Sequence, residues 1–314
     1  MKTTDLEYPL QKCVCICGST AKMPLIWRER HGLDIWPSFC LQCGHVYLAN
    51  RISGQNLIDF YSTSNYRTLY GAGDTLKSEE AKNARVMAAK NNLLPIVKAE
   101  RDRRQIASFK VIEWGCGAGW NLVPLRDEGF DVSGYDYDKS YIEFGVTEFK
   151  LKLNTITDET VHKIAGKADV LIINHVLEHI EDPFSTLKNL SVALKPGGIV
   201  IIGMPFLENI STWGLKSFFH IAHVHYFGIE HFCRIVEIFN WLVREVDVVK
   251  GIVVIASKSE NILDRLPENS TSFPRARMKN ASTLLVRLVK ELPLLIKGML
   301  RPIYHWIRSS NRGS

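Results

Sequence analysis

The most constraining feature of this chain is a glycine-rich turn near its middle, Lys110-Val-Ile-Glu-Trp-Gly-Cys-Gly-Ala-Gly119. A short apolar run ends in an acid and is followed by alternate glycines, as where a buried parallel strand opens into a tight turn before a helix. Glycine permits positive φ and leaves room for a ligand, and the helix that follows presents free N–H groups. The dinucleotide fingerprint needs glycine at its sixth position, which here is Trp120. The spacing is therefore Glu-x-Gly-x-Gly-x-Gly and not that fingerprint.

Three further segments continue the pattern of a parallel sheet. Residues 129–136 are predicted to form the next strand and end in Asp136, where a ribose-binding acid belongs in such a fold. Residues 168–174 form an unbroken apolar run, as expected for a strand buried on both faces. Residues 194–205 begin with a Pro-Gly-Gly turn and continue as another apolar run. The four segments predict an α/β fold.

With His175-Val-Leu-Glu-His-Ile-Glu-Asp-Pro183 and Leu194-Lys-Pro-Gly-Gly198, these segments resemble the class I S-adenosylmethionine-dependent methyltransferases. The resemblance implies a Rossmann-like core, a mostly parallel seven-stranded sheet with an antiparallel edge strand. It also implies S-adenosylmethionine as cofactor and Asp136 as the acceptor of hydrogen bonds from both ribose hydroxyls. The other residues that it places at or beside the cofactor are Glu113, Gly115, Gly117, Gly119, Asn174 and His175.

Five of the seven cysteines lie within the first 50 residues, which suggests a metal module. Cys40 and Cys43 have the usual spacing of a zinc knuckle. The first knuckle offers three thiols for two places: Cys13 and Cys17 are favoured, with Cys15 as the substitute for Cys13. Four thiolates would close the coordination shell, so the expected zinc is structural.

The order of parts resembles bacterial methyltransferases of sugar and surface-polysaccharide pathways, over roughly residues 13–260. The resemblance implies a carbohydrate or nucleotide-sugar acceptor and places the segment 219–227 at the acceptor pocket. One branch methylates carbon with a Tyr-x-Glu-His segment, but here the matching residues are His220-Ile-Ala-His223. That departure favours O-methylation over C-methylation. Alternate spacing would put His223 and His225 on one face, and histidine can act as a base near neutral pH, so either is a candidate general base.

The predicted organisation is a zinc ribbon at 1–55, a helical and aromatic linker and lid at 56–105, the methyltransferase core at 106–260, and a linker with a basic amphipathic tail at 261–314. From Arg275 onward nine basic residues face one acid, so this tail carries +8, and a net charge of +6 leaves −2 on the remainder. The small negative net charge of residues 1–274 argues against nucleic acid as the partner. No signal-peptide pattern or membrane span is found, which predicts a cytoplasmic protein.

Within the tail, residues 281–308 combine an apolar stripe with arginine and lysine. They are predicted to lie on the inner face of the membrane or to dock on a glycan-assembly partner, which vesicle flotation at low and high salt would test. Packing on the core or on a second subunit is the alternative. For the whole chain, a non-catalytic methyltransferase-like binding protein and an RNA methyltransferase are the competing functions. The intact glycine-rich turn with Asp136 argues against the first, and the charge of residues 1–274 against the second.

Overall fold

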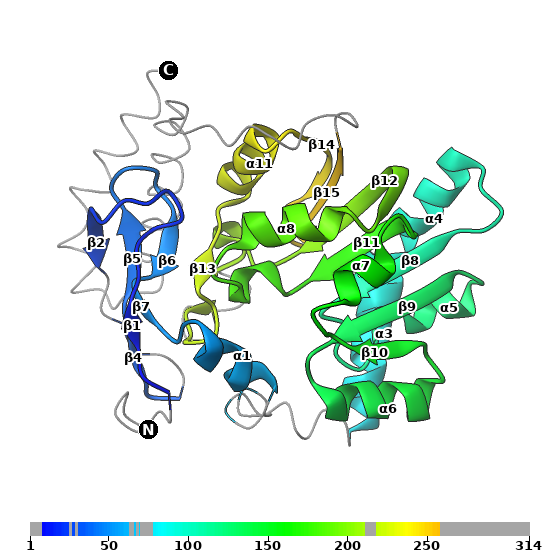
Figure 1. Cartoon of the computed structure of the whole chain (residues 1–314), viewed down its shortest axis with the longest axis horizontal. Coiled ribbons are helices and arrows are strands. Elements are labelled where there is room, and N and C mark those ends of the chain that lie inside the picture. The colour runs from blue at the N-terminus through cyan, green and yellow to red at the C-terminus, as the bar shows by residue number, and fades with distance from the viewer. Residues whose placement is uncertain are drawn as a thin grey trace.

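The computed structural model describes residues 8–24, 27–28, 31–62, 66, 69, 78–210 and 218–257 (Figure 1). The amphipathic tail predicted at 281–308 lies outside the described residues. Within the described ranges, no helix is both long enough and apolar enough to cross a membrane.

The strands, in chain order, are β1 (Gln11–Lys12), β2 (Lys22–Pro24), β3 (Trp27–Arg28), β4 (Asp34–Ile35), β5 (Pro37–Cys40), β6 (Val46–Leu48), β7 (Asn50–Arg51), β8 (Lys110–Trp114), β9 (Asp131–Asp136), β10 (Leu153–Thr155), β11 (Ala168–Asn174), β12 (Leu194–Gly203), β13 (His225–Tyr226), β14 (Trp241–Asp247) and β15 (Ile252–Ser257). The helices are α1 (Gln55–Ser62), α3 (Glu79–Asn92), α4 (Leu94–Arg104), α5 (Val123–Asp127), α6 (Lys139–Phe149), α7 (Thr160–Ile164), α8 (Pro183–Ser191) and α11 (Ile229–Ile238), with 3-10 helices η3 (Leu177–His179) and η4 (Leu207–Asn209).

The main sheet has seven strands in the order β10-β9-β8-β11-β12-β15-β14, and the first five are parallel. The predicted Rossmann-like, mostly parallel sheet is confirmed. The reversed strand is β15, which pairs antiparallel with both β12 and β14 and so lies second from the edge. The short strand β10 was not predicted, because its sequence Leu-Asn-Thr carries no apolar run.

Alternation along the buried strands divides the core into two layers, since successive side chains of a strand point to opposite faces. Val170 and Ile172 of β11 belong to the core under α4, α5 and α6. Leu171 and Ile173 belong to the core under α8 and α11. The sheet is therefore covered on both faces (Figure 1).

The helix predicted over 78–105 is observed as two helices that meet at Leu93. Ser78 caps the first by accepting a hydrogen bond from the Ala81 N–H at 3.3 Å. Pro95 lies in the first turn of the second, where proline costs no backbone hydrogen bond. The break near Pro95 is thus confirmed.

A second sheet joins the N-terminal segment to a distant part of the chain. Its order is β13-β6-β5-β2, and His225 of β13 pairs with Tyr47 of β6. Apolar residues of this segment and of α1 share one core with Phe218, Phe219 and Ile221. The loop before α11 is therefore held by the N-terminal module, which lies beside the main sheet (Figure 1).

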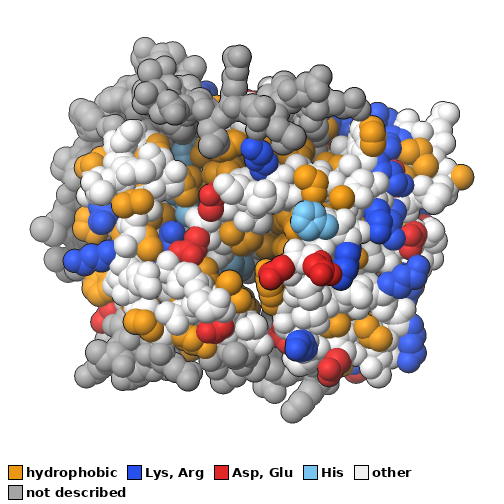
Figure 2. Space-filling view, in the orientation of Figure 1, with side chains coloured by type: hydrophobic (Ala, Val, Ile, Leu, Met, Phe, Trp, Pro, Cys, Tyr) orange, Lys and Arg blue, Asp and Glu red, His pale blue; other side chains and the backbone are white. Residues whose placement is uncertain are grey.

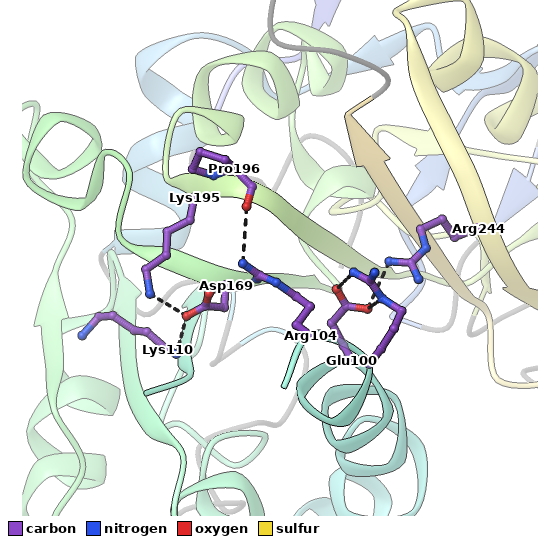
Figure 3. A network of polar contacts seen from close by, with 8 residues as sticks. Glu100, Arg104, Lys110, Asp169, Lys195, Pro196 and Arg244 are labelled. Carbon is purple, nitrogen blue, oxygen red and sulfur yellow. Dashed lines mark hydrogen bonds and ion pairs between the residues drawn. The ribbon is translucent and has the colours of Figure 1, made fainter. Parts of the chain in front are cut away.

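At the amino ends of the parallel strands, a buried carboxylate ties α4 to the sheet (Figure 3). Asp169 is fully buried and contacts Arg104 Nη1 at 2.9 Å and Lys195 Nζ at 2.6 Å. It also accepts a hydrogen bond from the Lys110 backbone N–H at 2.8 Å. One turn earlier in α4, Glu100 accepts from Arg244 of β14 at 3.1 Å. These pairs fix the scaffold at the end opposite the glycine-rich turn.

Candidate active site

A cavity of about 1210 Å³ lies where the carboxyl ends of the strands face α1, α3 and the loop before α11. Figure 2 shows a hollow between the N-terminal module and the main sheet. The lining of the cavity includes Gly115, Gly117 and Asp136 at the carboxyl ends of β8 and β9, and Tyr61, His179 and His223 from α1, η3 and the loop before α11. Ligands in open α/β sheets bind at this edge.

The glycine-rich turn has the backbone that its sequence predicts. Gly115, Gly117 and Gly119 have φ of +76°, +53° and +80°. A Cβ on Gly115 would also collide with Val176, which follows β11. A Cβ on Gly119 would press on Leu151 instead, and Gly119 does not line the cavity, so its role is packing.

Asp136 closes the turn from the neighbouring strand. Its Oδ2 accepts a hydrogen bond from the Gly117 N–H at 2.7 Å and its Oδ1 accepts from the Asp138 N–H at 2.9 Å. A carboxylate has about four acceptor sites in all. Because Asp136 also lines the cavity, its carboxylate can accept further hydrogen bonds from hydroxyl groups there.

Glu113 lies behind the turn and not in the cavity wall, contrary to the role implied by resemblance. Its side chain is buried, and Oε1 accepts a hydrogen bond from Asn121 Nδ2 at 2.6 Å. Burial raises the pKa of this carboxyl to about 8, although the bond from Asn121 opposes that change. Glu113 therefore holds the start of the following helix against β8.

Asn174 and His175, which the resemblance places at or beside the cofactor, both line the cavity. His175 has φ of +55°, an uncommon conformation for a residue other than glycine. Its backbone N–H donates to Gly203 O at 2.7 Å, which fixes the turn that leaves β11. This turn places η3, which follows β11, at the wall of the cavity.

Three side chains from two distant segments, Glu178, His179 and His223, form what we call the acceptor cluster. Glu178 Oε1 lies 3.8 Å from His179 Nε2 and 4.0 Å from His223 Nε2. The facing atoms of all three residues lie within 4.8 Å of one another. A hydrogen bond from the Val224 N–H to Glu178 O, 2.8 Å long, holds the two segments together.

The tautomer of His179 follows from its neighbours. Its Nδ1 lies 2.9 Å from Ala222 O, and a carbonyl oxygen can only accept, so Nδ1 carries the proton. Tyr61 OH also lies 2.7 Å from this nitrogen and 3.0 Å from Ala222 O. When this imidazole is neutral, its lone pair is therefore on Nε2, on the side of Glu178.

The charges within the acceptor cluster are set by burial and by proximity. Burial favours the neutral form of Glu178, but the charge of His179 and the hydrogen bond and charge of His175 hold the pKa of this carboxyl below its usual range. Burial, and then the nearby His220 and His179, lowers the pKa of His223 well below its usual value. The cluster thus presents a carboxylate beside a neutral imidazole.

His225 does not take part in the cavity, so its assignment as a candidate base is corrected. Its Nε2 donates to Glu181 O at 3.0 Å, and its Nδ1 lies 2.9 Å from His45 Nε2. Burial, followed by the charge of Arg51, lowers the pKa of His225 to about 3. The local backbone explains the error: His223 lies in a turn, with its N–H on His220 O at 3.1 Å, and not on an extended strand with His225.

The N-terminal thiols form a second cluster, which contains Cys15, Cys17, Cys40 and Cys43 and not Cys13. Cys15 Sγ lies 3.5 Å from Cys43 Sγ, and Cys17 Sγ lies 3.6 Å from Cys40 Sγ. Sulfur atoms around a tetrahedral zinc would be about 3.8 Å apart, given Zn–S bonds of about 2.3 Å. The thiols therefore fit zinc. Hydrogen bonding from Cys15 lowers the pKa of Cys17 to about 7, which favours a thiolate there.

Cys13 is excluded by the backbone. Its N–H donates to Ala49 O at 2.9 Å, which continues the pairing of β1 with β7. The first knuckle begins two residues later, where the Gly18 N–H donates to Cys15 O at 2.8 Å. It matches the second, where the Gly44 N–H donates to Cys40 O at 3.0 Å.

Sequence reasoning missed Glu178 and Tyr61 as parts of the site. A signal for Glu178 was present, because His175, Glu178 and His179 have the i, i+3, i+4 spacing of one helical turn after a strand end. No comparable signal marks Tyr61, whose place depends on how α1 packs against the core.

Comparisons with known proteins agree with this geometry. A family model described as a methyltransferase domain matches residues 79–246, more than half of the chain. The chain belongs to this methyltransferase domain family. The matched residues include the glycine-rich turn, Asp136 and every strand of the main sheet except β15 and the last residue of β14. The S-adenosylmethionine-dependent methyltransferase domain therefore contains most of the main sheet and much of the cavity lining.

Two relatives of this methyltransferase domain are named ubiquinone biosynthesis O-methyltransferase. The one from Rickettsia typhi is 32% identical over 112 residues, 34% of this chain and 45% of that protein. The one from Rickettsia felis is 31% identical over 185 residues, 52% of this chain and 72% of that protein. The chain thus spans about half the length of the first relative. Among solved structures, a magnesium protoporphyrin IX methyltransferase from Synechocystis with bound SAH has a TM-score of 0.44 and 16% identity, covering 63% of this chain and 94% of that one.

Substitution of Asp136 by alanine is expected to weaken binding of S-adenosylmethionine by about 1.5–3 kcal/mol, the usual contribution of hydrogen bonds to a charged group. The variant also releases the Gly117 N–H from its acceptor. Isothermal titration calorimetry measures the change. Asp131→Ala is the matched control, because Asp131 lies at the other end of β9 and contacts Lys110 and Lys152. Equal affinities for both variants would contradict the assignment.

Proposed function

We propose that this protein transfers a methyl group from S-adenosylmethionine to a hydroxyl oxygen of an acceptor held in the cavity. The observation that carries the proposal is the acceptor cluster, placed in the same cavity as the glycine-rich turn and Asp136. The cofactor supplies an electrophilic methyl group, so the protein has to align the acceptor and assist loss of its proton. His223 is the predicted histidine that lines the cavity, and we retain it for handling that proton.

As acceptor we propose a carbohydrate, either a nucleotide sugar or a surface glycan. Support comes from the polar wall beyond the acceptor cluster, where Glu181, Asp182, Ser185 and Asn189 line the cavity and could bind several hydroxyl groups. C-methylation of a keto sugar is less well supported, since Tyr and Glu of the carbon-methylating segment are absent at His220 and Ala222.

A phenolic hydroxyl is the second candidate acceptor. It is favoured by the relatives named ubiquinone biosynthesis O-methyltransferase and by the aromatic side chains of Tyr61, Tyr66 and Phe218 in the cavity lining. A flat aromatic acceptor could pack against these rings, whereas a sugar would depend more on the polar wall.

For the N-terminal module we propose one structural zinc held by Cys15, Cys17, Cys40 and Cys43. The four thiols complete a tetrahedral shell and leave no position for a substrate. The module then stabilises β6, which pairs with β13 and so supports the loop that carries His223.

The acceptor class is tested by incubating the full chain with S-adenosylmethionine labelled on the methyl group and a panel of sugar nucleotides, glycans and phenols. Label on a sugar oxygen supports the first acceptor, and label on a phenolic oxygen supports the second. Label on carbon would refute O-methylation. Absence of transfer to every acceptor, with cofactor binding intact, would favour a methyltransferase-like binding protein.

A further inference from the structure

The acceptor cluster has the arrangement of a cation site more than that of a hydrogen-bonded network. Glu178 Oε1 accepts a hydrogen bond from His175 Nδ1 at 3.2 Å. The same oxygen lies 3.8 Å from His179 Nε2 and 4.0 Å from His223 Nε2, too far for direct hydrogen bonds to either. These separations leave a gap that a cation could occupy. Glu178 is 1% exposed, and its Oε2 is buried with no hydrogen-bond partner among the described residues. Such an orphaned carboxylate oxygen calls for a ligand.

The surroundings of His179 match those of a metal-binding histidine. Such histidines usually donate their other ring N–H to a carbonyl or carboxylate, which fixes the tautomer and aims the ligating nitrogen. His179 Nδ1 does this with Ala222 O, and Tyr61 OH reinforces the contact. The lone pair on Nε2 is consequently held in place before any cation binds.

We propose that the acceptor cluster binds one divalent transition-metal cation through the Glu178 carboxylate, His179 Nε2 and His223 Nε2. Two imidazoles and one carboxylate suit zinc, iron, cobalt or manganese better than calcium or magnesium, which prefer oxygen ligands alone. Three ligands from one side leave coordination positions open, and His179 and His223 both line the cavity. The open positions therefore face the cavity, where an acceptor would bind.

This inference rests on the proposed function for the identity of the group that takes the open position, and it refines the role of His223. A hydroxyl bound to the cation loses its proton more readily, and that proton passes to solvent water. The acceptor oxygen then attacks the methyl carbon, so that a C–O bond forms while the C–S bond of the sulfonium breaks and leaves a neutral thioether. In this scheme His223 serves as a ligand and not as the general base.

The test uses the full chain with its cysteine site loaded with zinc, titrated with Mn²⁺ while the free ion is followed by electron paramagnetic resonance. Mn²⁺ suits the purpose because it prefers oxygen and nitrogen ligands to thiolates. We expect the wild type to bind one Mn²⁺ per chain, and Glu178→Gln and His223→Ala each to weaken binding more than about tenfold. Glu159→Gln and His162→Gln, both exposed on or beside α7, are the matched controls and should bind as the wild type does.

Affinity for S-adenosylmethionine reports whether each variant is folded. If Glu178→Gln does not bind the cofactor, cation binding by His223→Ala alone tests the proposal. Uptake of neither Mn²⁺ nor Co²⁺ by the wild type would overturn the proposal, as would undiminished binding by a folded His223→Ala variant. No acceptor is needed for this titration. Cation binding without methyl transfer to any acceptor would therefore support the cation site and contradict the proposed function. Methyl transfer without cation binding would support the proposed function and contradict the cation site.

Discussion

Replacement of His223 by alanine is expected to lower turnover about 10²–10⁴-fold, the range typical of groups that assist loss of a substrate proton. Nε2 of His223 lies 4.0 Å from Glu178 Oε1 and His223 lines the cavity, so the truncated side chain leaves the buried Glu178 carboxylate without one of its neighbours. Affinity for S-adenosylmethionine should change little, because the glycine-rich turn and Asp136 belong to the ends of β8 and β9, whereas His223 lies in the loop before α11. Steady-state kinetics with the acceptor found in the panel, together with calorimetry for the cofactor, measure both quantities.

A matched control for this variant is His162→Ala, an exposed histidine that does not line the cavity. It should keep the turnover of the wild type. Full turnover in His223→Ala would show that methyl transfer does not depend on the acceptor cluster. A large loss of cofactor affinity in the same variant would show instead that the loop as a whole had been disturbed.

Loss of zinc is expected to unfold the N-terminal module while the main sheet stays folded. Small metal modules draw their folding free energy from the metal, roughly 10–16 kcal/mol of apparent binding free energy in zinc-finger peptides. Cys15→Ser should abolish zinc binding by the thiol cluster and expose the N-terminal module to limited proteolysis. In the folded protein β6 of this module pairs with β13, and the Leu48 N–H donates to Val224 O at 3.0 Å. Without these contacts the loop with His223 should lose its support, so turnover should fall.

Cys13→Ser is the control, two residues away and outside the thiol cluster. By elemental analysis it should retain the zinc of the thiol cluster, and Cys15→Ser should contain one zinc fewer per chain. Protein purified without chelator that contains no zinc would contradict the assignment. The reverse pattern between the two variants would restore Cys13 as the ligand.

Much of the main sheet could be predicted from the sequence, because its signals are local. The apolar run of residues 168–174 needs burial on both faces wherever it lies. The glycines at 115 and 117 need positive φ, and Asp136 follows at the end of the next strand. Parallel strands end at one edge of a sheet, so these residues had to meet there. The order of motifs along the chain thus determined the fold class and the cofactor end of the cavity.

The choice among similar residues was decided by tertiary contacts. Cys13 and Cys15 are equivalent by composition, but pairing of β1 with β7 holds Cys13 in a ladder and leaves Cys15 to open the knuckle. His225 lies in β13, the strand that pairs with β6, whereas His223 lies in the turn before β13 and lines the cavity. Glu178 joins His223 only because a backbone hydrogen bond brings together two segments that are far apart in the chain. Local pattern specifies the elements of this protein, and long-range strand pairing and burial specify which side chains remain available for chemistry.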